Sequence, residues 1–393
     1  MNRAILNTEI QKYISENLGT ESSRILFGKS PFKEVTAKEL VEQIESKKRS
    51  EKKLPLWFKT NGIYFPKKLA IEQASSEITA RYKADLIIGK KVVDATGGLG
   101  IDSYYFSLKT GEVYHCEINP ELSAIAQNNA DVMGVNNIRF IIGDGLDFIL
   151  SANQIVDSIY IDPSRRVNAQ KVFMLKDCEP DVPGNLVGLL NSSLRIVLKT
   201  SPLLDLQSGL KELRNVKEIH VVSVKNDCKE LLWVIEKDFT EAEPIIICAA
   251  LDEKNRQVYT FKLSDERSFN IDRFSAPLKY IYEPDVALLK AGCFKLISRD
   301  FGVLKLHQHT HLYTSELFKT DFIGRKFALI ESRDYTDFIK KNDVKKANII
   351  SRNFPLQPHA LKKKHKILDG GNDYLLFTTG SENQLLVLHC RRL

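Results

Sequence analysis

Residues 91–103, KVVDATGGLGIDS, combine a buried strand, a glycine-rich turn and the beginning of a helix. The two valines form the apolar part of the strand, which ends at Asp94. Gly98 and Gly100 carry no Cβ atom, so the backbone of the turn can approach a ligand closely. The following helix presents free N–H groups and the positive end of its dipole to that ligand. The stretch therefore predicts a ligand-binding turn at a strand-to-helix junction.

Three further apolar strands follow along the chain. The segments EVYHCEI, IRFIIGD and SIYID carry Glu117, Asp144 and Asp162 at or next to their ends. A carboxylate at the tip of the second strand is typical of α/β folds that bind the hydroxyls of a ribose. In a parallel sheet all strand tips of this kind fall on one edge, where such folds bind ligands. We therefore expect these three acids and Asp94 to meet at one edge of a parallel sheet.

This array resembles a class I S-adenosylmethionine (SAM)-dependent methyltransferase over roughly residues 90–237. The first motif of that family has an acid followed by glycines spaced one apart, which Asp94, Gly98 and Gly100 match. Thr96 stands where many members have glycine. DATxGLGxD is most similar to the ribosomal RNA small subunit methyltransferase J group, from which the later DPSRR departs. A classical dinucleotide fold is disfavoured because G-x-G-x-x-G is absent.

The resemblance implies a contact for each part of SAM. The first turn meets the sulfonium and amino-acid end, Glu117 accepts hydrogen bonds from the ribose hydroxyls, and Asp144 accepts one from the adenine amine beside an apolar wall. The enzyme aligns the two reactants for an in-line displacement at the methyl group and excludes water. The residues implied for SAM binding are Asp94, Thr96, Gly98, Gly100, Asp102, Glu117, Ile118, Asp144 and Gly145.

The tip of the fourth strand, DPSRR, carries the residues implied for catalysis. Amino-methyltransferases of nucleic-acid bases have Asn or Asp, then Pro-Pro and an aromatic residue, and the first two residues accept hydrogen bonds from the exocyclic amine. Asp162 and Pro163 match, whereas Ser164 and Arg165 replace the second proline and the aromatic residue. Asp-Pro-Pro-Arg also occurs in uridine C5 methyltransferases, but the late-strand cysteine that these need is not evident here. We predict catalytic roles for Asp162, Pro163 and Arg165.

Two consecutive arginines, Arg165 and Arg166, follow at this predicted ligand edge. A guanidinium group binds a phosphate or a carboxylate through two parallel hydrogen bonds. We therefore predict that this pair contacts a phosphate or carboxylate of the substrate. The alternative is a structural ion pair with an acid downstream, namely Asp177, Glu179 or Asp181.

The remaining strands complete the predicted parallel sheet and end it with an antiparallel hairpin. Residues 194–199, 217–224 and 230–236 are apolar strands, and the last two are joined by only five residues. Such a short connection makes an antiparallel hairpin, because a parallel crossover needs a dozen or more residues. An antiparallel last strand is typical of the methyltransferase family, so the resemblance implies an α/β, Rossmann-like seven-stranded methyltransferase sheet. Residues 244–262 add two strands, which we expect to extend the same domain.

A chain of 393 residues is long enough for about two to four domains. The segment RNFPLQPHALKKKHKILDGG and the final strand pair resemble the THUMP-like C-terminal domain of some bacterial methyltransferases; true THUMP domains bind RNA. We predict a helical N-terminal region (1–80), a methyltransferase domain (81–275), a small α/β, ferredoxin-like linking domain (276–320) and a basic THUMP-like domain (321–393).

Some local predictions concern single elements. The periodicity predicts one helix over residues 69–86, which runs into the first strand, and another over residues 285–297. Residues 303–313 are predicted as one strand, on which His307, His309 and His311 share a face. Three side chains at period two splay too far apart for tight chelation, so we expect an exposed strand face and no metal site.

The net charge of +7 is uneven along the chain. Residues 341–393 contain ten lysines and arginines against four acids, a net charge of +6. A basic terminal module on an enzyme suggests a polyanionic partner such as RNA, for which Lys362, Lys363 and Lys364 are the predicted contacts. The alternative is a solvated face that only keeps the protein in solution.

Composition excludes several other classes of protein. No run of about 18 apolar residues predicts a membrane span, and the N-terminus lacks the layout of a signal peptide, so we expect a cytoplasmic protein. Six scattered cysteines without a C-x-x-C pair argue against a zinc ribbon or a disulfide framework and are expected to be small buried apolar residues. The oligomeric state stays open, with a monomer as the expectation.

These observations predict a SAM-dependent methyltransferase that acts on a base of structured RNA, either tRNA or rRNA. One alternative is a methyltransferase-like RNA-binding protein without activity, which the altered DPSRR motif suggests. The other is a methyltransferase that acts on a small molecule or a protein, with the basic tail used only for docking.

Overall fold

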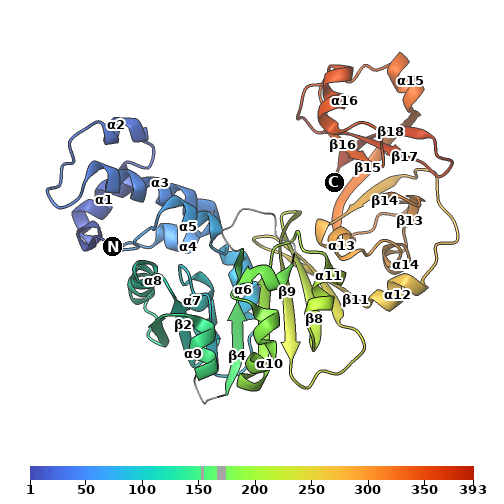
Figure 1. Ribbon diagram of the computed structural model, residues 1–393. Coiled ribbons are helices and arrows are strands. Elements are labelled where there is room, and N and C mark those ends of the chain that lie inside the picture. The colour runs from blue at the N-terminus through green and yellow to red at the C-terminus, as the bar shows by residue number, and fades with distance from the viewer. Residues whose placement is uncertain (152–154, 166–173) are drawn as a thin grey trace. The chain divides into compact units, whose positions relative to one another are not determined.

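The structure, a computed structural model, describes residues 1–151, 155–165 and 174–393 (Figure 1). The chain forms two compact units, which comprise residues 1–219 with 231–242 and residues 220–230 with 243–393.

The first unit begins with short helices, as predicted. The longest, α3, starts at Thr36 with a capping box, in which the Thr36 hydroxyl accepts from the Glu39 N–H and the Glu39 carboxylate accepts from the Thr36 N–H. The prediction of one helix over residues 69–86 is wrong, because Ser76 caps a new helix by accepting from the Thr79 N–H. The elements are η1 (Arg3–Leu6), α1 (Thr8–Glu16), α2 (Ser22–Leu26), α3 (Ala37–Lys53), α4 (Pro55–Lys59), α5 (Lys68–Gln73) and α6 (Glu77–Ala84).

A nine-stranded sheet has the order β11-β10-β8-β9-β7-β4-β1-β2-β3. The strands from β7 to β3 in this order are parallel, and β9 joins β7 antiparallel, which confirms the predicted methyltransferase topology. The two extra strands are β10 (Ile245–Leu251) and β11 (Arg256–Phe261). The other seven are β1 (Lys91–Asp94), β2 (Glu112–Glu117), β3 (Ile138–Ile142), β4 (Val156–Ile161), β7 (Ser193–Thr200), β8 (Val216–Val224) and β9 (Asp227–Glu236).

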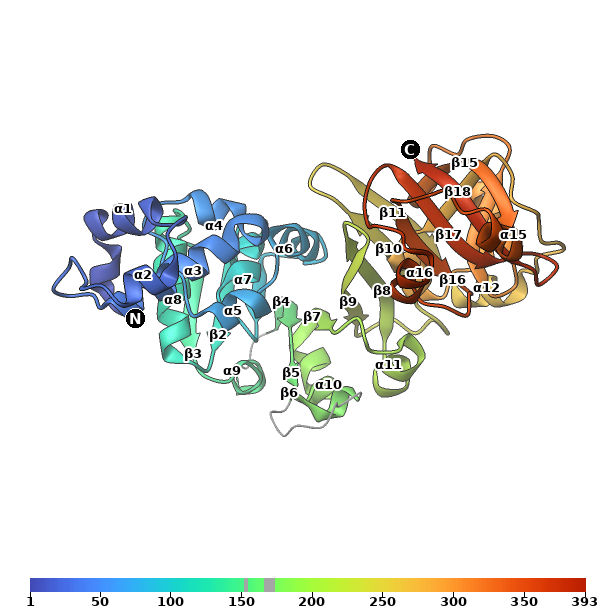
Figure 2. The same cartoon turned by 90° about the horizontal axis from the view of Figure 1, so that it is seen from above.

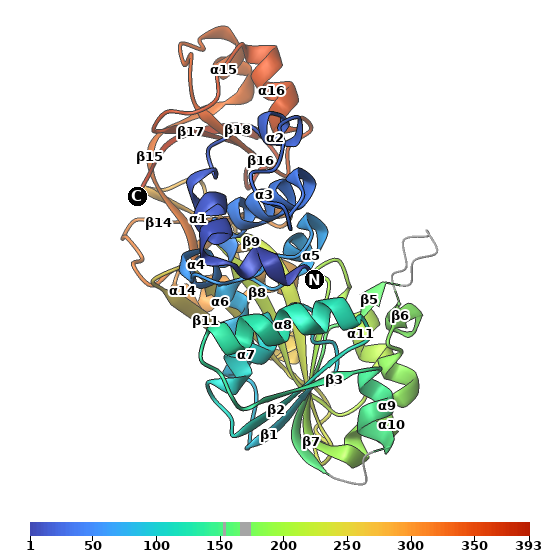
Figure 3. The ribbon, with the colours of Figure 1, turned by 90° about the vertical axis from the view of Figure 1, so that its left-hand side faces the viewer.

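Helices cover both faces of the parallel part of this sheet. Figures 2 and 3 show α7 (Ile101–Ser107) and α8 (Pro120–Val132) on one face and α9 (Gly145–Ser151) and α10 (Val182–Ser192) on the other. The central strands are accordingly apolar on both sides, as in Val92 and Val93 on β1. Shorter elements are β5 (Ser164–Arg165), η2 (Leu175–Asp177), β6 (Cys178–Glu179) and α11 (Leu206–Glu212).

The second unit contains a seven-stranded sheet of order β13-β14-β12-β15-β18-β17-β16. Residues 326–393 follow the order strand–helix–strand–helix, and the predicted final strand pair forms an antiparallel hairpin. The elements are α12 (Leu263–Ser268), β12 (Tyr280–Pro284), α13 (Val286–Ala291), α14 (Leu296–Phe301), β13 (Leu304–His307), β14 (Thr310–Ser315), β15 (Gly324–Asp334), α15 (Tyr335–Lys340), β16 (Asn348–Arg352), α16 (Pro358–His365), β17 (Asp373–Thr379) and β18 (Leu385–Arg392).

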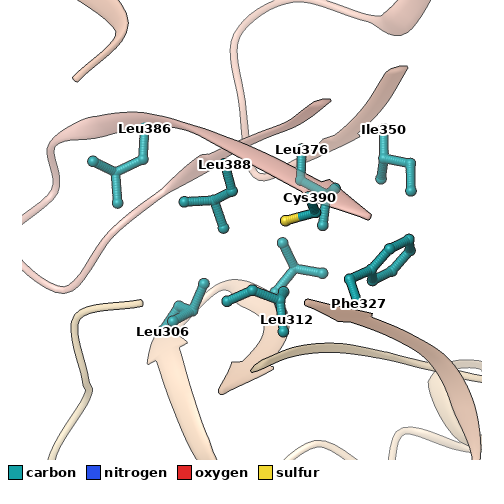
Figure 4. Packing of buried hydrophobic residues seen from close by; sticks show 9 residues of the cluster. Leu306, Leu312, Phe327, Ile350, Leu376, Leu386, Leu388 and Cys390 are labelled. Atoms are coloured by element: carbon teal, nitrogen blue, oxygen red, sulfur yellow. The ribbon is translucent and has the colours of Figure 1, made fainter. Parts of the chain in front are cut away.

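Both faces of this second sheet are buried at its centre. Figure 4 shows Leu376 and Leu388 in one apolar cluster, together with Leu306, Leu312 and Phe327. The residues that alternate with them on β17 and β18 form a second cluster, which includes residues of α15 and α16. The small linking region and the basic C-terminal region therefore share one sheet.

Two local predictions in this unit are wrong. The helix over residues 285–297 is divided into α13 and α14, because Gly292 takes a φ of +77° and ends the first helix. The strand over residues 303–313 is a hairpin of β13 and β14. His309 lies in its turn and His307 and His311 lie on different strands, so the three histidines do not share one strand face.

Among the described residues, no helix is long and apolar enough to cross a bilayer. The same residues contain no group of three or more histidines, cysteines and acids that could bind a metal ion. All six cysteines are free. Four are buried as expected, namely Cys116, Cys248, Cys293 and Cys390, whereas Cys178 and Cys228 are only partly buried.

Candidate active site

The glycine-rich turn between β1 and α7 is bonded to the neighbouring strand. The Gly97 N–H donates to the Cys116 carbonyl on β2 at 2.8 Å. Gly98 and Gly100 take φ values of +55° and +73°, which only glycine adopts without a steric cost. A Cβ atom on Gly98 would lie 3.9 Å from the Thr96 carbonyl oxygen, so space is open at this point of the turn.

Glu117 lies beside this turn, as the sequence predicts. Its Oε2 atom accepts from the Gly98 N–H at 2.9 Å, and its Oε1 atom accepts from the Asn119 N–H at 2.7 Å. Next to it, Ile118 is 66% exposed, and Ile142 at the tip of β3 is 64% exposed. A fixed carboxylate and two uncovered apolar side chains thus lie at the tips of β2 and β3.

The third strand tip is bonded to the helix that follows it. The Asp144 Oδ1 atom accepts from the Leu146 and Asp147 N–H groups at 2.7 and 3.1 Å, at the beginning of α9. A Cβ atom on Gly145 would lie 2.2 Å from the Ala95 carbonyl oxygen, so glycine is required for this close approach to the tip of β1. Asp144 and Gly145 therefore lie next to the first turn.

Asp94 is fully buried beneath the turn. Its carboxylate accepts from the Ser103 hydroxyl at 2.5 Å and from the Thr96 N–H at 3.3 Å, and the Ser103 hydroxyl also bonds His115 Nδ1 at 3.0 Å. Burial raises the pKa of Asp94 to about 7, although the Ser103 hydrogen bond opposes the shift. Burial lowers the pKa of His115 to about 3, so this ring is neutral at pH 7.

The raised pKa of Asp94 predicts a pH-dependent stability. Between pH 3.8 and about 7 the folded chain retains a proton on Asp94 that the unfolded chain has lost. The associated stability is therefore present at low pH and lost as the pH rises through 7. Relative to Asp94→Asn, the wild type should lose on the order of 2 to 3 kcal/mol of unfolding free energy between pH 5 and pH 8. Urea titrations at both values measure this difference, and an equal difference at both would contradict the prediction.

Asp102 belongs to a second buried network. Lys83 Nζ on α6 lies 2.9 Å from Asp102 Oδ1, and the Ser75 hydroxyl donates to Asp102 Oδ2 at 2.7 Å. The Tyr160 hydroxyl on β4 donates to the same oxygen at 3.2 Å. The Asp94 carboxylate is thus bonded to Thr96 and Ser103, and the Asp102 carboxylate to Lys83 and Tyr160. Direct contact of either carboxylate with a cofactor stays a prediction. Lys83 was not predicted, because it lies on a helix whose sequence is that of an ordinary amphipathic helix.

Asp162 lies at the fourth strand tip with two partners of its own. Its N–H donates to the Thr96 hydroxyl of the first turn at 2.7 Å. Its Oδ2 atom accepts from Lys199 Nζ on β7 at 2.7 Å. Thr96, where glycine is common, therefore bonds the first and fourth strand tips together. Lys199 was not predicted; it lies at the end of the predicted strand LRIVLK, which the structure places next to β4.

The arginine pair after Asp162 is described only in part. The backbone of Arg165 pairs with Cys178 in a two-stranded ribbon of β5 and β6, and Ser164 before it is exposed. The side chain of Arg165 and all of Arg166 lie outside the described residues. Asp181, one suggested ion-pair partner, accepts from the Gly184 N–H at 3.0 Å at the beginning of α10.

The predicted RNA contacts lie on α16 in the second unit. Lys363 and Lys364 are exposed, and Lys364 Nζ lies 5.2 Å from the centre of the Tyr335 ring. Lys362 Nζ lies 2.7 Å from the Asp369 carboxylate. At least two of the three ammonium groups therefore face solvent.

Comparisons with known proteins agree with the methyltransferase fold of this chain. A model of a ferredoxin-like domain matches residues 280–322, and a model of a THUMP domain-like family matches residues 328–392. A crystal structure from Porphyromonas gingivalis W83, of a protein assigned as a methyltransferase, is 34% identical with a TM-score of 0.88, over 98% of this chain and 97% of that one. An uncharacterized SAM-dependent methyltransferase of Mycobacterium tuberculosis is 23% identical over 76% of this chain and 80% of its own length. The chain therefore belongs to the family of SAM-dependent methyltransferases that also contain ferredoxin-like and THUMP-like domains.

Proposed function

We propose that this SAM-dependent methyltransferase transfers its methyl group to a base of structured RNA, either tRNA or rRNA. The observation that carries the proposal is the combination, in one chain, of a methyltransferase sheet and a THUMP-like region, with a net charge of +6 over residues 341–393. A region of this charge gains affinity for a polyanion through the release of counterions. True THUMP domains bind RNA, which makes RNA the first polyanion to test.

The proposed SAM site is the edge formed by the tips of β1, β2 and β3. Glu117 is the proposed partner of the ribose hydroxyls, because its carboxylate is fixed by two N–H groups and stays partly exposed. Asp144 is the proposed acceptor for the adenine amine, and the exposed Ile118 and Ile142 fit an aromatic ring. The open space at Gly98 fits the amino-acid end. Bound SAM supplies an electrophilic methyl group on its sulfonium.

The proposed catalytic group is Asp162 with the Pro163 carbonyl. Both would accept hydrogen bonds from a nucleophilic N–H, which orients its lone pair and excludes water from it. Arg165 and Arg166 are the proposed contacts for a phosphate of the RNA backbone. A cytoplasmic, monomeric enzyme remains the expected form of the protein.

Mass spectrometry of nucleosides from cells with and without the gene tests the proposed function. We expect one methylated nucleoside to disappear from tRNA or rRNA without the gene, and to return with the wild-type gene but not with Glu117→Ala. Purified protein with labelled SAM should then label RNA from the deficient cells. Unchanged nucleosides together with normal SAM binding would favour the small-molecule or protein substrate, and RNA binding without any transfer would favour the inactive RNA-binding protein.

The role of α16 can be measured as a salt dependence. Replacing Lys362, Lys363 and Lys364 with alanine should weaken RNA binding and reduce the slope of log affinity against log salt by about 2, because each lost phosphate contact removes about 0.7 to 0.9. Lys362 contributes less, since it is paired with Asp369. The triple arginine variant retains the charge and should retain the slope. Fluorescence anisotropy at several salt concentrations measures both, and equal slopes in all three proteins would exclude α16 from the contact.

A further inference from the structure

Asp162 and Lys199 form an ion pair at the edge where the proposed SAM site lies. The two residues come from neighbouring parallel strands, whose register pairs Ile161 with Leu198 and so brings the next residues opposite each other. Asp162 Oδ2 lies 2.7 Å from Lys199 Nζ. The side chains are 29% and 20% exposed, so the pair lies at the rim of the edge and not in the core.

The pair orients the carboxylate from a second direction. The Asp162 backbone is already fixed by its N–H bond to the Thr96 hydroxyl, but that bond leaves rotation of the side chain free. The Lys199 ammonium directs Oδ2 toward β7. A carboxylate has about four lone-pair sites on its two oxygens, so one bond from lysine leaves acceptor sites for a substrate N–H.

This ion pair is expected to contribute little to folding stability. Partly exposed pairs contribute little to stability, because solvent screens them and both side chains lose rotamer freedom. A reacting group misplaced by about 1 Å, in contrast, can cost on the order of 100-fold in rate. Removal of Lys199 should therefore reduce the reaction rate much more than the folding stability, if its role is to orient Asp162.

We propose that Lys199 is a positioning residue of the methyl transfer, which acts by holding the Asp162 carboxylate toward the substrate nucleophile. The inference rests on the proposed function for its kinetic readout. It gives a role in catalysis to Lys199 on β7, a residue outside both the SAM-binding turn and the DPSRR motif.

The test compares Lys199→Met and Lys199→Arg with a matched control, Lys217→Met. Lys217 Nζ lies 2.9 Å from Glu236 in the same unit, and the side chains are similarly exposed, at 35% and 21%. With RNA from deficient cells, we expect Lys199→Met to lower kcat by about 100-fold. Its KM for RNA and its SAM affinity should be unchanged. Lys199→Arg should recover most of the rate because it keeps the cation, and Lys217→Met should be fully active.

A crystal structure of Lys199→Met gives a readout that does not depend on RNA. We expect the Asp162 side chain to leave the rotamer that it has in a wild-type crystal. An unmoved carboxylate, or a fully active Lys199→Met enzyme, would overturn the inference. An equal loss of activity in Lys217→Met would assign the effect to general stability and would overturn it as well. A wild-type enzyme inactive on RNA would refute the proposed function alone, and the crystallographic comparison would still decide the role of Lys199.

Discussion

Replacing Glu117 with alanine is expected to weaken SAM binding by about 100-fold, or roughly 3 kcal/mol, because the variant lacks the carboxylate that we propose accepts charge-assisted hydrogen bonds from the ribose hydroxyls. The substitution also removes the acceptor of the Gly98 N–H, 2.9 Å away, so the turn loses a bond that fixes its conformation. Isothermal titration with SAM measures the effect directly. Methyl transfer should fall with the occupancy of the cofactor.

Glu112→Ala is the matched control for this prediction. Glu112 lies on the same strand at its other end, where its carboxylate accepts from the Tyr114 hydroxyl at 2.9 Å. The variant loses the same charge from the same strand and should bind SAM as the wild type does. If both variants, or neither, lost affinity, then the tip of β2 would not be the ribose site, and the assignment of SAM to this edge would fail.

Replacing Lys83 with methionine is expected to destabilise the first unit by about 3 to 5 kcal/mol, because a buried carboxylate would lose its paired cation. Lys83 is completely buried, and its ammonium lies 2.9 Å from Asp102 and 3.4 Å from the Tyr160 hydroxyl. Its loss therefore weakens the connection between α6, α7 and β4 beneath the turn. Both tryptophans of the chain, Trp57 and Trp233, belong to the first unit, so tryptophan fluorescence in urea reports on that unit.

Two further variants test whether the loss of stability is caused by the unpaired buried charge or by lost packing. Lys83→Met combined with Asp102→Asn removes both charges and should recover much of the lost stability. Lys109→Met removes an exposed ion pair with Asp85, in which the side chains are 57% and 38% exposed, and should change stability by less than about 1 kcal/mol. A double variant no more stable than Lys83→Met would show that packing and not charge causes the loss.

The parallel arrangement of the strand tips could be predicted because its signals are local. Each strand is a short apolar run that ends in an acid, and a glycine turn or a helix follows. These patterns placed Glu117 beside the first turn and Asp144 next to it, as the hydrogen bonds and the close approach of Gly145 to Ala95 confirm. The antiparallel last strand was also predictable, since the connection between β8 and β9 is too short for any other path.

The wrong predictions share a physical cause, which is that one or two residues can interrupt a periodic apolar pattern. Ser76 begins a new helix within an otherwise helical pattern, because its side chain supplies a cap. Gly292 ends α13 by taking a left-handed conformation. The turn between β13 and β14 interrupts an alternation that continues on both sides of it. A periodic pattern is averaged over several residues, so it does not reveal a cap or a turn of one or two residues.

By itself, the sequence determined the strands of the parallel sheet, the antiparallel hairpin at its end and the acids at the strand tips, because these follow from periodicity, connection length and the rule that parallel strands end together. Only the tertiary structure decided which charges meet. Lys83 and Asp102 are 19 residues apart, and Asp162 and Lys199 are 37 apart. Such pairs depend on which strands become neighbours and which way each side chain turns, and short-range patterns do not encode either choice.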